Sequence, residues 1–251
     1  MKERRATAGP GAHSLAFVTE EYTETALHFE LPRLPRLLER YLTPGPLALA
    51  DLGCGDGPLF AALERGGFIG PARPVYAVDL EPARLARVSA RFPWIETVVA
   101  SANSVPSIGS GVLDVVISTM VMEHVPDEGT YLAEIRRMLR PEGRAYVTTV
   151  FKRSWAWYFR KRGGESVLDT SHLREYTDVE AFRRLLLDSG FELLALELKR
   201  LWFPLLDPLL FRLGHRYPEL SGQRSALRAL RAPKVPIPGY YSLDAALERR
   251  L

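Results

Sequence analysis

The chain has 251 residues, 47% of them apolar and 25% charged, a composition that excludes a disordered protein and supplies a sizeable core. Its net charge is +3, and most basic residues lie among Glu and Asp in helix-like segments, as on solvated faces, which argues against a nucleic-acid partner. Cys54 is the single cysteine, so no intrachain disulfide is possible. Since neither a secretory signal nor a bilayer-spanning apolar stretch is present, a cytoplasmic location is predicted.

Residues 1–41 are predicted to form a flexible arm followed by a helix that covers the core. The arm is rich in Gly, Ala, Arg and Pro. The helical segment spans residues 19–41 and is interrupted by Pro32 and Pro35, because proline lacks the amide hydrogen that a helix interior requires.

From residue 42 onward, short apolar runs alternate with segments of helical periodicity. This alternation predicts βαβ units, and therefore a parallel sheet with helices on both faces. The predicted strands are residues 47–52, 75–80, 97–100, 112–118, 144–150 and 191–199, and the predicted helices are residues 59–64, 82–91, 128–139 and 178–189.

Three segments do not fit this alternation. Residues 151–177 are rich in aromatic, Lys and Arg residues, and residues 201–239 are apolar and rich in proline. Connections of this length in a compact domain are usually functional, so we expect a lid from 151–177 and a cap insertion from 201–239. Residues 240–250 suit either a strand or a short helix.

A glycine loop carries the chemistry. In residues 47–60, LALADLGCGDGPLF, an apolar run ends at Asp51 and three alternating glycines precede a helix. A chain that turns from a buried strand into a helix needs residues that accept positive φ, and bare backbone where a ligand approaches. The dinucleotide fingerprint has a third glycine where Pro58 stands, which favours a ligand with a nucleoside and an amino-acid tail.

Two acids accompany this loop. Asp51 is placed to receive the ammonium group of an amino-acid tail. Asp79 ends the next predicted strand, where a carboxylate accepts two hydrogen bonds from a ribose diol. A glycine loop alone is weak evidence, but a loop, a helix and an acid closing the next strand form a specific pattern.

Six motifs resemble those of class I S-adenosylmethionine-dependent methyltransferases, in particular the small-molecule ("type 11") group that contains ubiquinone and menaquinone methyltransferases. The resemblance covers roughly residues 48–197. The motifs are DLGCGDG (51–57), VDLEP (78–82), ASANSVP (100–106), LDVVISTMVMEHV (113–125), EIRRMLRPEGRAYVTT (134–149) and HLREYT (172–177).

The resemblance implies a doubly wound α/β fold whose seven-stranded, mostly parallel sheet ends in an antiparallel strand, for which residues 240–251 are the candidate. The core would then comprise residues 42–200 and 240–251. The implied cofactor is S-adenosyl-L-methionine, which becomes S-adenosyl-L-homocysteine after transfer.

The resemblance also assigns cofactor contacts. Gly53, Cys54, Gly55 and Gly57 would border the methionine, with Asp51 near its amino group and Cys54 as a small side chain that fits rather than a nucleophile. Asp79 would bind the ribose. The remaining implied contacts are Leu80, Ser101 and Ala102 around the adenine, Ser118, Thr119 and Met120 at the methyl-transfer site, and Tyr22 covering the cofactor. The family usually has an acid where Ser101 stands.

Three residues are candidates for catalysis. His172 is the first choice as a base, since histidine titrates near the working pH, with His124 second and Tyr176 a weaker third. Asp114 is interpreted as structural. The five histidines are scattered along the sequence and none pair, so no metal site is predicted.

The sequence therefore predicts methyl transfer to an oxygen or carbon of a small-molecule or lipid-like acceptor. A membrane contact through the apolar residues 201–211 is compatible with such an acceptor. Two alternatives stay open: a tRNA-modifying methyltransferase, and a non-catalytic protein that binds the cofactor as a sensor or partner subunit. The pattern indicates no oligomeric state.

Overall fold

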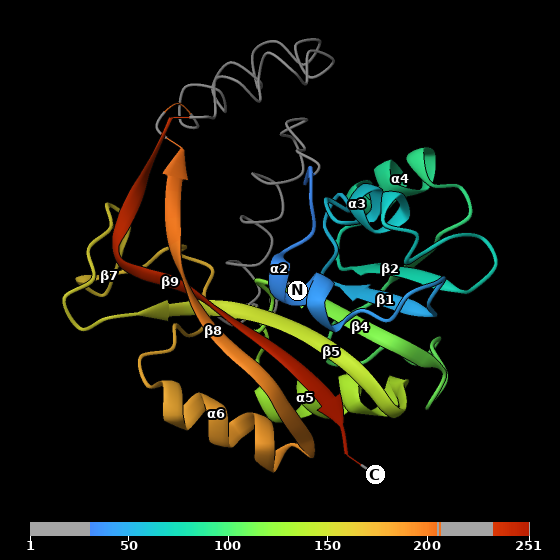
Figure 1. Cartoon of the computed structure of the whole chain (residues 1–251). Coiled ribbons are helices and arrows are strands. Elements are labelled where there is room, and N and C mark those ends of the chain that lie inside the picture. The colour runs from blue at the N-terminus through green and yellow to red at the C-terminus, as the bar shows by residue number, and fades with distance from the viewer. Residues whose placement is uncertain (1–30, 205, 207–232, 251) are drawn as a thin grey trace, which may run out of the picture.

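The computed structural model describes residues 31–204, 206 and 233–250 (Figure 1). The predicted arm, Tyr22 and most of the cap insertion lie outside the described residues.

Within the described residues, seven strands form one sheet in the order β3-β2-β1-β4-β5-β9-β8, with β9 antiparallel to both of its neighbours. The strands are β1 Leu49–Leu52, β2 Val75–Asp79, β3 Glu96–Val99, β4 Leu113–Thr119, β5 Leu139–Lys152, β8 Phe191–Pro204 and β9 Lys234–Arg249.

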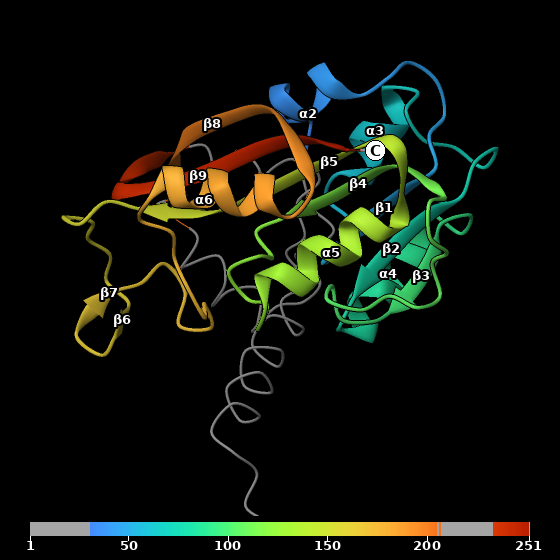
Figure 2. The same cartoon turned by 90° about the horizontal axis from the view of Figure 1, so that it is seen from below.

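Helices cover both faces of the sheet (Figure 2). On one face α2 (Arg36–Tyr41), α3 (Phe60–Arg65) and α4 (Pro82–Arg91) share one buried apolar cluster, and on the other α5 (Glu128–Met138) and α6 (Val179–Asp188) share a second. The predicted doubly wound α/β fold is confirmed. A small hairpin of β6 (Lys161–Arg162) and β7 (Glu165–Ser166) lies apart from the sheet.

The helix boundaries follow from capping residues. Asp127 accepts a hydrogen bond from Thr130 N at the start of α5, and Asp178 accepts from Glu180 N and Ala181 N at the start of α6. Gly190, with φ +84°, ends α6 as predicted. None of the helices among the described residues is long and apolar enough to cross a membrane.

The C-terminal hairpin differs from the prediction. Residues 240–249 form a strand, but β9 begins at Lys234 and pairs with an extended β8, so the ends of the predicted cap insertion belong to the sheet. Pro236 and Pro238 are tolerated because β9 pairs with β5 only from Tyr240 onward, which leaves one edge of this segment without a strand partner.

The topology fixes where a ligand can bind. β1 pairs in parallel with both β2 and β4, so the chain winds away from β1 in opposite directions on its two sides. In open α/β sheets, ligands bind beyond the carboxyl ends of the strands at this switch point. Here the loops that follow β1, β2, β4 and β5 meet there.

Candidate active site at the carboxyl edge of the sheet

The glycine loop after β1 leaves no room for side chains. Gly53 has φ +68°, and a Cβ there would lie 2.3 Å from Val121 Cγ2. Gly57 has φ +67°, and a Cβ there would lie 2.5 Å from the Phe60 ring. Gly53 N and Cys54 N donate to Val78 O at 2.8 and 3.0 Å, which holds the loop against β2. The loop therefore exposes bare backbone to a ligand.

Asp51 is a buried carboxyl group near the end of β1. It is 1% exposed, and its Oδ1 has no hydrogen-bond partner in the part of the chain that the structure describes. Burial, with a smaller contribution from the charge of Asp79, raises its pKa to about 8. A buried carboxylate of this kind calls for a cation, and the ammonium group of an amino-acid ligand fits that requirement.

Asp79 is oriented by the loop that it faces. Its Oδ2 accepts a hydrogen bond from Gly55 N at 2.8 Å and its Oδ1 accepts one from Glu81 N at 3.0 Å. Each oxygen keeps a further lone pair for a ribose hydroxyl. The following Leu80 is 58% exposed, and Val99, the register partner of Asp79, is 60% exposed. These two side chains offer an apolar surface suited to a flat base.

Ser101 and Ala102 lie beside this surface, at the end of β3. Ala102 is buried, and Ser101 Oγ accepts a hydrogen bond from Asn103 N at 3.3 Å, which orders the turn to Ser104. The hydroxyl proton of Ser101 is free to donate to a ligand, whereas the acid that usually stands here accepts a hydrogen bond. Together, the glycine loop, two acids and apolar surface fit an adenosyl cofactor with an amino-acid tail.

Residues 118–120 are predicted to line the methyl-transfer site, but Ser118 differs from Thr119 and Met120 in its burial. Ser118 is fully buried, and its Oγ donates to Leu52 O at 2.9 Å, so it supports the end of β1 from inside the sheet. Thr119 and Met120 are half-buried. Met120 has φ +57°, a costly conformation for a residue with a side chain, and such strain clusters at functional sites.

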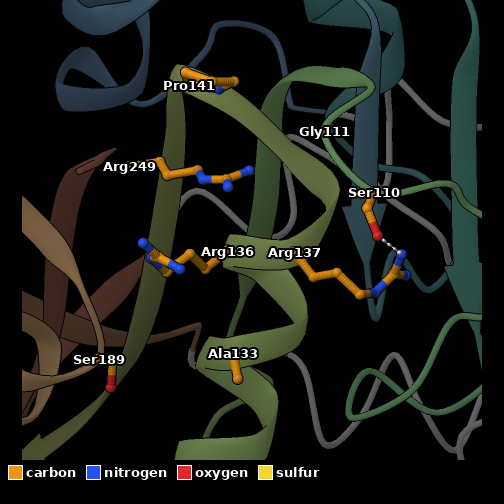
Figure 3. A pocket seen from close by; sticks show the side chains of 8 residues that line it. All are labelled: Ser110, Gly111, Ala133, Arg136, Arg137, Pro141, Ser189 and Arg249. Atoms are coloured by element: carbon orange, nitrogen blue, oxygen red, sulfur yellow. Dashed lines mark hydrogen bonds between the residues drawn. The ribbon is translucent and has the colours of Figure 1, made fainter. Parts of the chain in front are cut away.

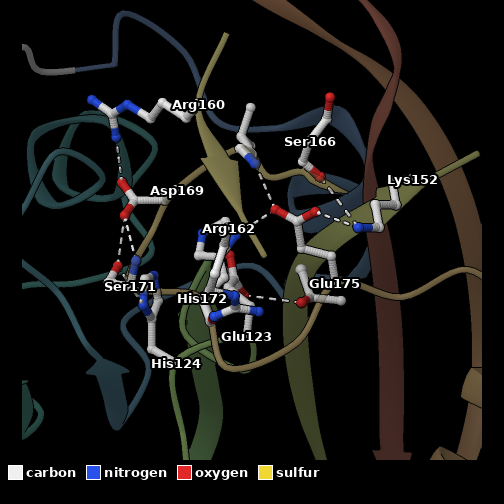
Figure 4. Close-up of polar contacts among 12 residues, drawn as sticks. Glu123, His124, Lys152, Arg160, Arg162, Ser166, Asp169, Ser171, His172 and Glu175 are labelled. Carbon is white, nitrogen blue, oxygen red and sulfur yellow. Dashed lines mark hydrogen bonds and ion pairs between the residues drawn. The ribbon is translucent and has the colours of Figure 1, made fainter. Parts of the chain in front are cut away.

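A polar cluster follows β4, formed by Glu123, His124 and His172 (Figure 4). One potential ligand atom from each residue lies within 4.8 Å of the others, and the two imidazole ring centres are 4.8 Å apart. The expectation that no histidines pair is thus wrong for His124 and His172. It failed because 47 residues separate them, and only the fold brings the 169–175 loop over the end of β4.

Each imidazole is oriented through its Nδ1 atom. His172 Nδ1 lies 2.9 Å from Glu175 Oε1. His124 Nδ1 lies 3.3 Å from Ser171 Oγ, which donates to Asp169 Oδ1 at 2.8 Å. This leaves the Nε2 atom of both rings available. Burial, and then the nearby His172, lower the pKa of His124 to about 4, so that imidazole is neutral at pH 7.

The carboxylates around the cluster differ in their partners. Burial opposes ionisation of Glu175, but hydrogen bonds from His172 and Leu168 N prevail and lower its pKa. Lys152 Nζ lies 3.5 Å from Glu175 Oε2. Glu123 is 0% exposed; Thr149 Oγ1 donates to its Oε2 at 2.9 Å, while Oε1 has no partner among the described residues. Burial raises the pKa of Glu123.

Tyr176 lies apart from this cluster. Its hydroxyl donates to Glu128, and its ring packs against Phe182 at 4.8 Å between centres. Arg174, two residues earlier, donates to the main-chain oxygens of Met122, at 3.1 Å, and Pro126, at 2.9 Å. The HLREYT segment therefore holds the loop after β4 in place through hydrogen bonds. We interpret Tyr176 as part of this structural contact.

Glu123 and Glu175 are the residues that the sequence argument missed. Both lie inside motifs that it quoted, MEHV and HLREYT, beside histidines that it selected. Their spacing carried no recognisable ligand pattern, because the two segments meet only in three dimensions. Asp114 was interpreted as structural, and this is confirmed: its carboxylate accepts from Ala48 N, Arg73 and Arg140.

A group of packed aromatic side chains lies next to the polar cluster. Tyr158, from the predicted lid, lies 6.2 Å from Tyr240 and 6.1 Å from Phe203, ring centre to ring centre. These rings share an apolar cluster with the side chain of Met120. The predicted lid and the ends of the predicted cap therefore pack together next to the residue that follows β4.

A separate cavity of about 560 Å³ lies at the opposite, amino edge of the strands (Figure 3). It is lined by Arg136, Arg137 and Arg249. These guanidinium groups already donate to protein oxygens: Arg136 to Gly190 O, Arg137 to Glu134 and Arg249 to Leu139 O. Among the described residues that line this cavity, none is acidic, histidine or cysteine, so we do not assign the chemistry to it.

Comparison with known proteins agrees with this geometry. Residues 50–147 match the family model described as a methyltransferase domain. A probable S-adenosylmethionine-dependent methyltransferase of Mycobacterium tuberculosis is 30% identical over 144 residues, which cover 56% of this chain and 47% of the relative. The ubiquinone biosynthesis O-methyltransferase of Caulobacter vibrioides is 32% identical over 126 residues, covering 49% of this chain and 48% of the relative. The chain thus spans about half the length of the curated relatives it matches.

Solved structures share the fold. A putative methyltransferase from Bacillus halodurans superposes with a TM-score of 0.60 at 16% identity, covering 86% of this chain and 98% of that one. A geranyl diphosphate methyltransferase gives a TM-score of 0.55 at 19% identity, covering 85% of this chain and 75% of that one. Residues 50–147 thus match a methyltransferase domain, and the seven-stranded sheet has the class I methyltransferase fold of these solved structures.

Proposed function

We propose that the protein transfers a methyl group from S-adenosylmethionine to an oxygen of a small, largely apolar acceptor. The observation that carries the proposal is Asp51, a buried carboxyl group whose Oδ1 has no partner among the described residues. It lies at the base of the glycine loop, on the same sheet edge as the histidine cluster. A site that only stored a cofactor would not need the second feature.

The chain's own residues would bind the cofactor at three points. Asp51 would pair with the ammonium group, Asp79 would accept the ribose hydroxyls, and Leu80 would contact the base. The bound cofactor supplies a sulfonium-linked methyl group whose departure leaves a neutral thioether, so the leaving group needs no acid. The protein's main task is then to position the acceptor in a pocket that excludes water.

The acceptor side suits an apolar molecule with an ionisable hydroxyl group. Phe203, partly buried against the buried rings of Tyr158 and Tyr240, offers an apolar surface. The cluster of Glu123, His124 and His172 would promote loss of the hydroxyl proton. His172 is the first candidate base, because Glu175 orients its ring, and His124 is the second. The O-methyltransferase names among the relatives favour oxygen over carbon.

The proposal is tested by incubating the purified protein with cofactor labelled in its methyl group and with fractionated cell extract. Label is expected in a small-molecule or lipid fraction, and not with Asp51→Asn under the same conditions. Label recovered in RNA would identify a tRNA-modifying enzyme instead. Cofactor binding measured by calorimetry, with no labelled product from any fraction, would indicate the sensor or partner subunit.

A further inference from the structure

We propose that Glu123, His124 and His172 bind a divalent transition-metal ion of the Zn²⁺ class on the acceptor side of the site. The inference rests on the proposed methyl transfer and specifies how the cluster promotes loss of the acceptor's proton: the histidines act as ligands of the ion rather than as bases. Three features of the cluster support it.

The first feature is the set of donor atoms. Two imidazoles and one carboxylate are the ligands of catalytic zinc sites that keep a position open for substrate. Imidazole nitrogen selects transition metals over Mg²⁺ and Ca²⁺, which prefer oxygen ligands. A proton-transfer step needs one base, whereas this cluster brings three basic groups to one point (Figure 4).

The second feature is the orientation of the rings. His172 Nδ1 lies 2.9 Å from Glu175 Oε1, and His124 Nδ1 lies 3.3 Å from Ser171 Oγ, which is bonded to Asp169. Histidines that ligate a metal usually donate their other ring nitrogen to a carboxylate or a comparable acceptor, which fixes the ring and its tautomer. Both imidazoles have such a partner, so each keeps Nε2 for an ion.

The third feature is the unpartnered oxygen of Glu123. The side chain is fully buried; Oε2 accepts from Thr149, but Oε1 has no partner among the described residues. Buried carboxylate oxygens rarely lack a donor or a cation, because their desolvation is costly. A divalent ion bound by all three residues would give this oxygen the partner that it lacks among the described residues.

The cluster must contract to bind the ion. Its potential ligand atoms lie within 4.8 Å of one another, whereas ligands of a tetrahedral zinc ion lie roughly 3.3 Å apart at bond lengths of about 2.0–2.1 Å. Ion binding would therefore draw the Glu123 and His124 side chains inward by rotation about their χ angles. His124 is half-buried and therefore has room to move.

The ion would act as a Lewis acid. The acceptor's hydroxyl oxygen occupies its open position, and the proton leaves to water because the ion lowers the pKa of a bound hydroxyl group. The oxygen lone pair then forms the bond to the methyl carbon, and the electron pair of the carbon–sulfur bond stays on sulfur. The products are a methyl ether, a proton and a neutral thioether, so no oxidant or reductant is required.

The test uses the full chain without a histidine tag, treated with chelator and then titrated with ZnCl₂ by calorimetry and with CoCl₂ by visible absorption. We expect one ion per chain, a cobalt spectrum of low coordination number, and no comparable binding of MgCl₂. Glu123→Gln and His124→Ala should each weaken zinc binding at least tenfold. Glu180→Gln, which removes an exposed carboxylate on α6, is the matched control and should bind as the unaltered protein does.

The outcomes separate this inference from the proposed function. Zinc binding that Glu123→Gln and His124→Ala leave unchanged, or no zinc binding at all, overturns the metal site; methyl transfer that persists in chelator would then return the histidines to the role of bases. His124 is half-buried, so its variant remains informative if Glu123→Gln does not fold. Stoichiometric zinc binding without any methyl transfer supports the metal site and instead overturns the proposed function.

Discussion

The two halves of the site are built in different ways. The cofactor half, after β1 and β2, is built mainly from main chain: glycines that leave no room for side chains and amide groups that donate to neighbouring strands. Two acidic side chains, Asp51 and Asp79, complete it. The acceptor half, after β4 and β5, consists of side chains from segments far apart in sequence, in which Glu123 meets His172 and Tyr158 meets Tyr240.

This difference has a functional meaning. A main-chain cradle can be assembled from one short segment and suits a ligand that every member of a family shares. A side-chain cluster can be exchanged residue by residue without disturbing the sheet, so it suits an acceptor that changes between relatives. Variants in the two halves should therefore affect different steps.

The largest effect is expected from His172→Ala. Removing the imidazole leaves the acceptor oxygen without its activating group, and turnover should fall roughly 10²–10³-fold. Cofactor affinity measured by calorimetry should change less than twofold, because the His172 side chain is bonded to Glu175 in the acceptor half. Unchanged turnover would remove His172 from the acceptor half.

Asp51→Asn should produce the complementary result. Loss of a charge-assisted, buried ion pair weakens cofactor binding by about 2–3 kcal/mol, or roughly 30–150-fold. Equilibrium binding by calorimetry measures this change. Normal cofactor affinity in the variant would show that Asp51 does not bind the ammonium group.

The same variant separates binding from folding through its pH dependence. The pKa of Asp51 is about 8 in the folded protein, well above its ordinary value of 3.8, so the folded state binds the proton more tightly than the unfolded state does. Stability of the unaltered protein should fall as pH rises from about 4 to about 8, by at most about 1.4 kcal/mol per pH unit. Thermal unfolding of Asp51→Asn should lack this component, so the variant should gain relative stability as pH rises. An equal pH dependence in both proteins would contradict the buried, unpaired state of Asp51.

Tyr176→Phe should have a smaller effect, on stability alone. The variant loses the hydrogen bond to Glu128, worth about 1 kcal/mol, while the ring keeps its contact with Phe182. Chemical denaturation measures the change, and turnover should stay within about threefold of normal. A tenfold loss of turnover without a loss of stability would return Tyr176 to the candidate bases.

The contrast between the halves also explains what the sequence could predict. The glycine loop, Asp51 and Asp79 were recognisable because their spacing is local: the loop covers residues 51–57, and helix α4 was placed at Pro82–Arg91. The pairing of His124 with His172 and the unpartnered oxygen of Glu123 depend on a contact across 47 residues, which periodicity does not encode. The strand β9 was recognised only from residue 240, because Pro236 and Pro238 suggest a loop unless the unpaired edge is known.

Ser118→Ala tests the boundary between the halves. The sequence assigned Ser118 to the methyl-transfer site, whereas its hydroxyl donates to Leu52 O from a fully buried position between β4 and β1. Alanine leaves that carbonyl oxygen without its donor, so the free energy of unfolding should fall by about 1–2 kcal/mol, while the cofactor affinity and turnover of the folded protein change less than threefold. Thr119→Ala is the matched control. Thr119 is the next residue along the strand, but unlike Ser118 it is half-buried and lies at the site itself. If Ser118→Ala instead lowered turnover tenfold at unchanged stability, the hydroxyl would act on the ligand, and the cofactor half would extend into β4. Ser118→Ala thus decides where the main-chain part of the site ends and the side-chain cluster begins.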